Sequence, residues 1–124
     1  MPVPILKQGN YLIAPIQASL TDEQMLLFRS KLAEEVGRTR VSGVVIDVSG
    51  LDVIDSFTAR TLQDVTRMVK LRGAEAVVVG IQPALAFAMI QLGLGLEGVA
   101  TALDLEEGLE LIKWLGLNRH ARGR

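Results

Sequence analysis

The sequence has no cysteine and a single histidine, His120, and these two shortages remove several classes of function at once. Without cysteine, the chain cannot form disulfides, thiolate metal sites, iron–sulfur clusters or a thiol nucleophile. A lone histidine near the C-terminus leaves little basis for a Ser-His-Asp triad or a histidine metal site. We therefore expect no catalytic residue, no metal and no cofactor, and we expect that the protein is not an enzyme.

Neither sign of charge is in excess, since 13 Lys and Arg residues stand against 14 Asp and Glu residues and the net charge is −1. Such a chain has no basic field to attract nucleic acid or an anionic membrane surface. Aromatic residues are scarce at 4%, yet hydrophobic residues make up 49%, which excludes a disordered chain. The 124 residues are enough for one domain with a core of its own. The low charge of this hydrophobic chain also leads us to expect self-association.

A membrane span has to be considered, because residues 76–96 form an uncharged run of 21 residues. Gly80, Pro83 and Gly93 interrupt this run, and residues 77–79 are all β-branched valines. The segment therefore predicts a buried strand, a turn and a helix that begins at Pro83, with no crossing of a membrane.

Apolar and turn residues along the whole chain predict alternating strands and helices after an opening hairpin. Gly9 and Asn10 provide the hairpin turn. We expect strands at residues 4–6, 11–16, 44–48, 76–79 and 99–101, and helices at about 22–36, 56–71, 83–92 and 104–115. This order predicts one α/β domain, with a mixed sheet of four to five strands covered by about four helices.

Capping residues and glycines set the expected ends of these helices. Thr21 and Gln24 form a capping box before the first helix, and Gly37 is expected to end it. Asp104 and Glu107 repeat the capping pattern before the last helix, which is expected to end before Gly116. The buried stripes of the first two long helices are expected to be Met25, Phe28, Leu32 and Val36, and Ala59, Leu62, Val65 and Val69. We place the domain at residues 1–117 and a basic, flexible tail at 118–124.

Two nucleotide or phosphate chemistries are weighed and set aside. Residues 93–98 match the G-x-G-x-x-G pattern, but the pattern follows a predicted helix, whereas a dinucleotide site needs it between a strand and a helix. Asp47 ends a predicted buried strand, as the acceptor Asp of a receiver domain does. The first strands, however, end in Ala14, Pro15 and Ile16 and offer no acidic pair for magnesium.

Three acidic residues, Asp47, Asp52 and Asp55, gather around the end of the third predicted strand. Their spacing matches no known oxygen cage for a cation. We expect them to serve in turns and helix caps.

The segment from Asp47 to Ala59 is the most informative part of the sequence. A buried strand ends, a loop turns, and Asp55 and Ser56 stand where a helix begins, so either residue can cap it. A helical wheel places Phe57 nearly opposite the buried stripe, which predicts an apolar contact surface for a partner. Burial of Phe57 under a neighbouring loop is the alternative.

Four segments spread along the chain carry a resemblance to a known family. They are Pro-Ile-Leu-Lys at 4–7, Val-Ile-Asp-Ser-Phe at 53–57, Gly-Ile-Gln-Pro-Ala at 80–84 and Thr-Ala-Leu-Asp-Leu-Glu at 101–106. Over about residues 3–117 the chain resembles STAS domains, the anti-sigma-factor antagonist family. Within this family it is most similar to the RsbS-type scaffold proteins of the bacterial stressosome.

This resemblance implies a cytoplasmic scaffold protein without catalysis that acts in signal transduction during the stress response. It implies partners of three kinds: a serine/threonine kinase of the RsbT type, paralogous sensor-bearing STAS proteins of the RsbR type, and a phosphatase. It also implies that Ser56 is the phosphoacceptor, with Thr58 as the runner-up and Ser49 behind it. Phosphorylation would release the sequestered kinase.

The residues around Ser56 are the expected partner-binding surface, namely Leu51, Asp52, Val53, Asp55 and Phe57. Phe57 and Thr58 depart from the Ser-Gly that often follows the phosphoacceptor in free anti-sigma antagonists. That departure favours the scaffold subgroup. The alternative is a soluble anti-sigma-factor antagonist that binds an anti-sigma factor or kinase directly.

Overall fold

A computed structural model of the protein describes residues 3–18, 20–93, 95–96 and 98–122. The elements follow the chain as β1 (Leu6–Gln8), β2 (Tyr11–Gln17), α1 (Asp22–Thr39), β3 (Gly43–Gly50), α2 (Ser56–Leu71), β4 (Glu75–Val79), α3 (Pro83–Gln91), β5 (Ala100–Ala102) and α4 (Leu105–Arg122). The sheet order β1-β2-β3-β4-β5 equals the chain order, with β1 antiparallel and the other pairs parallel. The predicted α/β domain with a mixed, hairpin-led sheet is confirmed.

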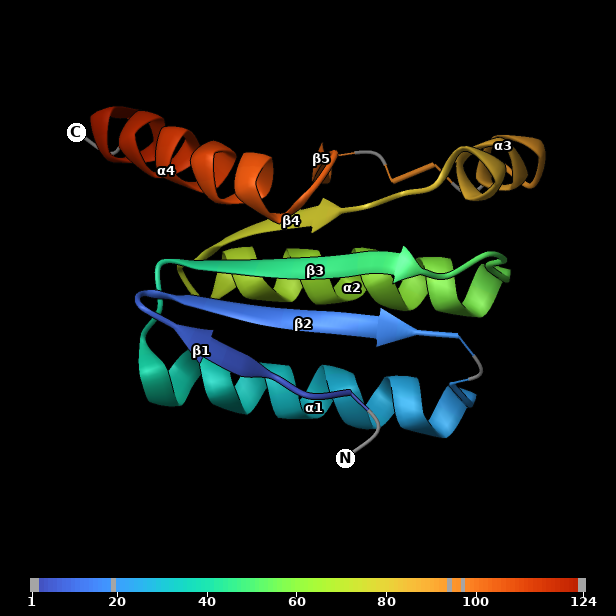
Figure 1. Ribbon diagram of the computed structural model, residues 1–124. Helices are drawn as coiled ribbons and strands as arrows, with labels where there is room; N and C mark the ends of the chain where they lie inside the picture. Colours follow the sequence, from blue (N-terminus) through green and yellow to red (C-terminus); the bar gives the residue numbers. More distant parts are fainter. Residues whose placement is uncertain (1–2, 19, 94, 97, 123–124) are drawn as a thin grey trace.

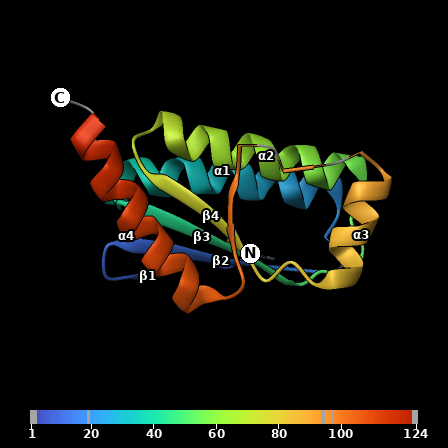
Figure 2. The same ribbon diagram turned by 90° about the horizontal axis from the view of Figure 1, so that it is seen from above.

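Helices cover both faces of the sheet (Figures 1 and 2). Helices α1 and α2 lie side by side on one face, and α4 crosses the other. Alternate strand residues supply the two cores, as the two-residue period of a strand requires. On β3, Val44, Ile46 and Val48 join the core under α1 and α2, whereas Val45 joins Ile112 of α4.

The hairpin forms at the predicted turn, but its first strand is displaced. Gln8 pairs with Tyr11, which leaves Gly9 and Asn10 as a two-residue turn, with Gly9 at φ +60°. This turn fixes the strand end at residue 8, so β1 covers 6–8 and the predicted 4–6 is wrong. The last strand is also one residue later than expected, at Ala100–Ala102.

The helix starts are predicted well, and two of the helix ends are not. The Thr21–Gln24 capping box is present, α2 has the predicted bounds, and both expected stripes are buried. Helix α1, however, continues through Gly37 to Thr39 and ends at Arg40, which adopts the left-handed conformation at φ 53°. Gly37 is an interior residue of α1, and the guanidinium of Arg72, the residue after α2, occupies the space that a side chain at Gly37 would need.

Helix α4 likewise passes through Gly116 and reaches Arg122, so it extends into the segment expected to be a flexible tail. Residues 123–124 and the side chains of 119–122, His120 included, lie outside the described residues. At the start of α4, Asp104 Oδ1 accepts from the Glu107 N–H at 2.9 Å. The Glu107 carboxylate accepts from the N–H of Leu103 at 3.3 Å, one residue before the position that a capping box requires.

The uncharged segment 76–96 contains β4 and α3, as its pattern predicts. All five residues of β4 are buried, and Pro83 begins α3. In the described part of the chain, no helix has the length and apolar character that a membrane crossing requires.

Candidate functional site

Asp55 and Ser56 lie where the loop after β3 meets the start of α2, at the carboxyl edge of the parallel strands (Figure 1). Strand β3 ends at Gly50, residues 51–55 form the loop, and α2 starts at Ser56. The carboxyl ends of β2, β3 and β4 meet at this edge. Loops from separate parts of the sequence therefore gather around Ser56, which is the usual place for a site in an open α/β sheet.

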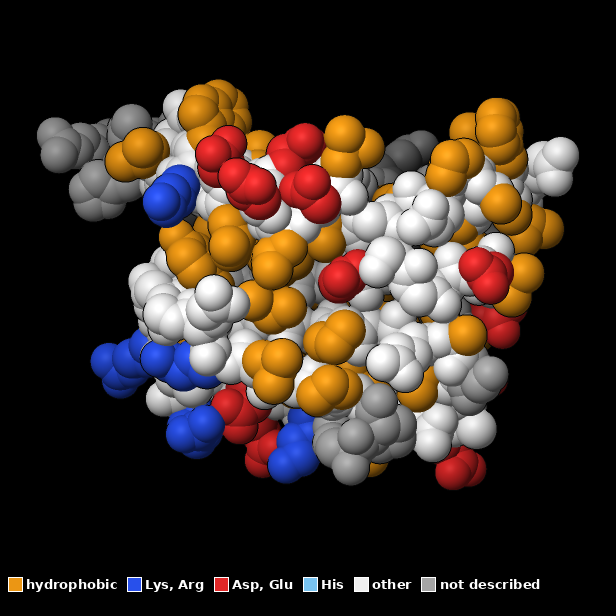
Figure 3. All heavy atoms as spheres, in the orientation of Figure 1, with side chains coloured by type: hydrophobic (Ala, Val, Ile, Leu, Met, Phe, Trp, Pro, Cys, Tyr) orange, Lys and Arg blue, Asp and Glu red, His pale blue; other side chains and the backbone are white. Residues whose placement is uncertain are grey.

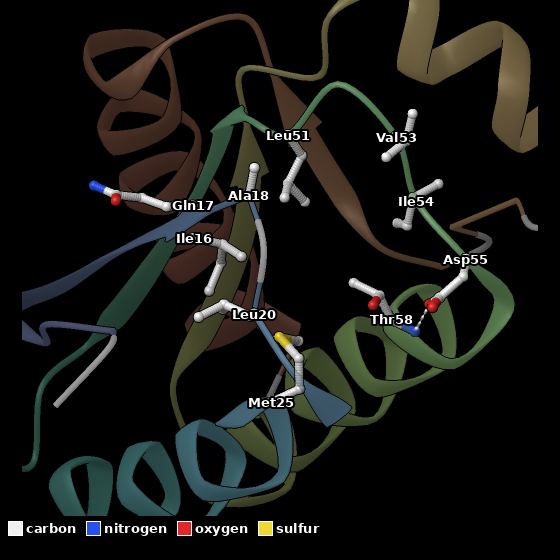
Figure 4. Close-up of a pocket in the computed structure, with 10 residues that line it drawn as sticks. All are labelled: Ile16, Gln17, Ala18, Leu20, Met25, Leu51, Val53, Ile54, Asp55 and Thr58. Carbon is white, nitrogen blue, oxygen red and sulfur yellow. Dashed lines mark hydrogen bonds between the residues drawn. The ribbon is translucent and has the colours of Figure 1, made fainter. Parts of the chain in front are cut away.

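Asp55 is the residue that caps α2. Its Oδ1 accepts a hydrogen bond of 2.7 Å from the backbone N–H of Thr58, with its own backbone extended at φ −100° and ψ 173° (Figure 4). Hydrogen bonds from Thr58, its backbone N–H first and its side chain second, hold the pKa of the Asp55 carboxyl below the usual range. The choice between Asp55 and Ser56 as the cap is therefore settled in favour of Asp55.

Ser56 is the first residue of α2 and is exposed. Its hydroxyl makes no hydrogen bond to any residue that the structure describes. The first N–H groups of a helix have no intrahelical acceptor, and Asp55 uses only that of Thr58. Ser56 therefore presents a free hydroxyl beside the unpaired N–H groups of the first turn.

The two other candidate acceptors are placed differently. Thr58 is half-buried, its backbone is held by Asp55, and its side chain lines a pocket (Figure 4). Ser49 is exposed at the end of β3, and its N–H donates to Asp47 Oδ1 at 2.9 Å. Of the three, Ser56 alone combines exposure with a position on the first turn of a helix.

The pocket beside this site has a volume of about 320 Å³ and lies between the end of β2, the start of α1 and the loop before α2 (Figure 4). Its wall is mostly apolar, with the Asp55 carboxylate as an acidic group. The lining residues are Ile16, Gln17, Ala18, Leu20, Met25, Leu51, Val53, Ile54, Asp55 and Thr58. The first five and Ile54 were not among the site residues expected from the sequence, although parallel strands that end at one edge bring the loops after β2 and β3 together.

The expected partner-binding residues divide into exposed and buried ones. Val53 is 79% exposed, and Asp52 and Asp55 are also exposed. Leu51 is only 6% exposed and belongs to the main core, so it has almost no surface to offer a partner.

Phe57 is half-buried and packs against the main core, so its expected position on the solvent side of α2 is wrong. Met68 also packs against the main core, and Thr61, one turn after Phe57, is 3% exposed. Gln63 on the other flank of the helix bonds to the Gly95 carbonyl. A wheel drawn for one helix omits the elements packed against it, and α1 lies beside α2 (Figure 2).

Of the three acidic residues expected in turns and caps, Asp47 and Asp55 have such roles, whereas Asp52 accepts no hydrogen bond from the described residues. Asp47 accepts from the Ser49 N–H, and Asp55 caps α2. Among the described residues, no group of three His, Cys, Asp or Glu side chains is arranged to hold a metal ion. The G-x-G-x-x-G segment lies between α3 and β5 and not between a strand and a helix, as a dinucleotide site requires, and its described residues Gly93 and Gly98 have positive φ.

Known proteins resemble this chain in sequence and in structure. The RsbT co-antagonist protein RsbRA of Bacillus subtilis is 28% identical over 101 residues, which are 82% of this chain and 37% of RsbRA. Its B. subtilis relative RsbRD is 26% identical over 78% of this chain and 35% of its own length. The chain thus spans little more than a third of these curated relatives.

Structural relatives cover the chain more completely. RsbS of Moorella thermoacetica, solved as a serine-to-glutamate variant, is 38% identical with a TM-score of 0.81, over 93% of this chain and 97% of RsbS. A chain in the solved molecular architecture of the stressosome, a signal integration and transduction hub, is 39% identical with a TM-score of 0.78, over 90% and 97%. The sequence of residues 3–107 matches the STAS domain, and the chain belongs to the STAS domain family.

Proposed function

We propose that this chain is a non-catalytic, phospho-regulated scaffold of a stressosome-type assembly in the bacterial cytoplasm. It sequesters a serine/threonine kinase of the RsbT type and releases it when Ser56 is phosphorylated, in the regulation of the environmental stress response. Its co-assembling partners are copies of itself and sensor-bearing STAS proteins of the RsbR type, and a phosphatase removes the phosphate. The likeness to RsbS and to a stressosome chain, each covered over 97% of its length, supports this role.

The observation that carries the proposal is that Asp55, and not Ser56, caps α2. Asp55 caps α2, so the Ser56 hydroxyl stays exposed and unbonded among the described residues. A kinase can therefore modify Ser56 without breaking a contact that the fold uses. A phosphate on Ser56 would also meet the positive end of the helix dipole.

Electrostatics supplies the mechanism of release. A phosphoserine adds a charge of about −1.5 to −2 next to the exposed carboxylates of Asp52 and Asp55. A partner packed over Val53 and the accessible part of Phe57 would have to desolvate that charge, which opposes close contact. The kinase is thus released while the domain stays folded.

The alternative, a free antagonist that binds an anti-sigma factor directly, predicts a much smaller size in solution. A scaffold mixed with an RsbR-type partner should elute as a megadalton-scale assembly, whereas a free antagonist should elute as a small protein. Size-exclusion chromatography with light scattering separates the two.

The modification itself is tested by incubating the protein with its cognate kinase and ATP, followed by intact-mass and peptide-level mass spectrometry. We expect one phosphate, on Ser56, and none on the Ser56→Ala variant. Undiminished phosphorylation of Ser56→Ala, or a phosphate mapped to Thr58 or Ser49, would remove Ser56 from this role.

A further inference from the structure

Basic residues are absent from most of the surface around Ser56. The sequence has no Lys or Arg from residue 41 to 59 and none from 73 to 112, which covers β3, the loop before α2, β4, α3 and β5. Of the other elements that line the pocket, β2 has no Lys or Arg, and α1 begins with Asp22 and Glu23. In the view of Figure 3, acidic and apolar side chains cover the right-hand end, where α3 lies, and no Lys or Arg appears there.

Arg60 is the exception, and its position relative to Ser56 is specific. It lies four residues after Ser56 in the same uninterrupted helix, and both residues are exposed. Side chains at this spacing lie on one face, with their Cβ atoms about 5–6 Å apart. An anion that precedes a cation by four residues is also the favourable order on a helix.

Arg60 forms no ion pair with the described residues, where the one salt bridge joins Arg38 to Glu35. Asp64 is the acidic residue on the same helix that could compete with the phosphate for Arg60. It is exposed and follows Arg60 by four residues, in the less favourable order. A phosphate carries up to twice the charge of the Asp64 carboxylate and accepts the forked N–H groups of a guanidinium.

We propose that Arg60 is the intramolecular partner of a phosphate on Ser56 and holds it against the first two turns of α2. The pair offsets the repulsion from Asp52 and Asp55 and keeps the start of α2 folded in the phosphorylated state. This inference deepens the proposed function and rests on it, since it assigns a residue to the phosphorylated form of the same site.

The test uses the full chain with phosphoserine incorporated at position 56 during translation, so that no kinase is needed. The phosphorus NMR signal is titrated with pH in the parent phosphoprotein and in its Arg60→Gln and Arg60→Lys variants. The matched control is Arg67→Gln, an exposed arginine on the same helix about 16 Å from Ser56 along the helix axis. Thermal unfolding of each protein without phosphate checks the fold.

We expect Arg60→Gln to raise the second pKa of the phosphate by about 0.2–0.4 units relative to the parent, because a cation favours the dianion. Arg60→Lys should recover part of the difference, Arg67→Gln should leave the value unchanged, and 1 M salt should remove the difference. Equal phosphate pKa values in the parent and in Arg60→Gln would overturn the proposal, as would an equal change in Arg67→Gln. If the cognate kinase modified another residue, the proposed function would be refuted. The comparison of phosphate pKa values would still test the role of Arg60, because the phosphoserine is incorporated during translation.

Discussion

The Asp55 carboxylate accepts a 2.7 Å hydrogen bond from the backbone N–H of Thr58, and this bond determines what Ser56 is free to do. Because Asp55 caps the helix, the serine that follows it is the first helical residue and has no capping duty. The carboxylate that holds the helix start also lies beside the hydroxyl that would receive a phosphate. Asp55 therefore contributes both to the stability of α2 and to the negative field that a phosphate would complete.

The cap predicts different effects for two substitutions of Asp55. Asp55→Ala should lower the free energy of unfolding by about 0.5–2 kcal/mol, because the N–H of Thr58 loses its acceptor. Asp55→Asn should stay close to the parent at pH 7, since asparagine is an equally good cap. Urea denaturation at pH 7 compares the three proteins, and an Asn variant as unstable as the Ala variant would contradict the capping role.

The lowered pKa of Asp55 predicts a pH dependence with a defined sign. A carboxyl whose folded pKa lies below its unfolded value stabilises the fold above the unfolded value, and this stability is lost as pH falls through the folded pKa. The parent, close in stability to Asp55→Asn at pH 7, should therefore become less stable than this variant as pH falls from 5 to below the ordinary value of 3.8. Thermal unfolding between pH 7 and 2.5 measures it. Asp52→Asn removes an exposed carboxylate of the same loop that caps no helix and is the matched control, so the same change in both variants would argue against the Asp55 cap as the cause.

The exposed and the buried apolar residues of the loop should respond differently to substitution. Val53→Glu should weaken kinase binding without affecting the thermal midpoint, because Val53 is 79% exposed. Leu71→Glu is the matched control, since Leu71 is 88% exposed at the far end of α2, about 22 Å from Ser56 along the helix axis. Equal loss of kinase affinity in the two variants would argue against a binding surface at Val53.

Leu51, by contrast, is a core residue, and Leu51→Ala should lower the free energy of unfolding by about 2–5 kcal/mol. Urea denaturation measures this cost. A Leu51→Ala protein with parental stability and reduced kinase binding would instead identify Leu51 as a contact residue.

Two glycines of α4 predict opposite effects of the same substitution. A Cβ at Gly108 would stand 2.7 Å from Val79 Cγ1, so Gly108→Ala should cost about 1–3 kcal/mol by forcing α4 away from the sheet. At Gly116 a Cβ meets nothing within 4 Å, so Gly116→Ala should gain up to about 1 kcal/mol from the better helix former. Thermal denaturation of both variants checks the pair, and destabilisation by both would mean that helix α4 requires glycine for another reason.

Capping and turn residues in the sequence predicted those element ends that depend only on residues close in sequence. Helix α2 has the expected bounds because Asp55 and Ser56 mark its start and Gly73, at φ +95°, follows its end. The hairpin turn and the Thr21 capping box follow for the same reason. The family that the four short segments indicated is confirmed by the STAS domain match over residues 3–107.

The predictions that failed depend on neighbours that are distant in sequence. Gly37 was expected to end a helix, but it lies inside α1, where the Arg72 side chain, distant in sequence, occupies the space beside it. Phe57 was expected to face solvent from a wheel drawn for one helix, which omits the core residues that pack against it. The pocket was missed because its wall combines the end of β2 with the loop after β3, and only the parallel pairing of those strands brings the two together.

The most direct test of the account is the affinity of the cognate kinase for the full chain with and without phosphoserine at position 56, measured beside the thermal midpoint of each form. The account predicts that the phosphate sharply weakens binding while the midpoint stays near that of the unmodified protein. Ser56→Ala should bind the kinase like the unmodified protein, and Ser56→Asp should weaken binding only in part, because a carboxylate carries less charge than phosphate. Unchanged affinity after phosphorylation, or a loss of affinity that follows only from melting of the domain, would contradict it.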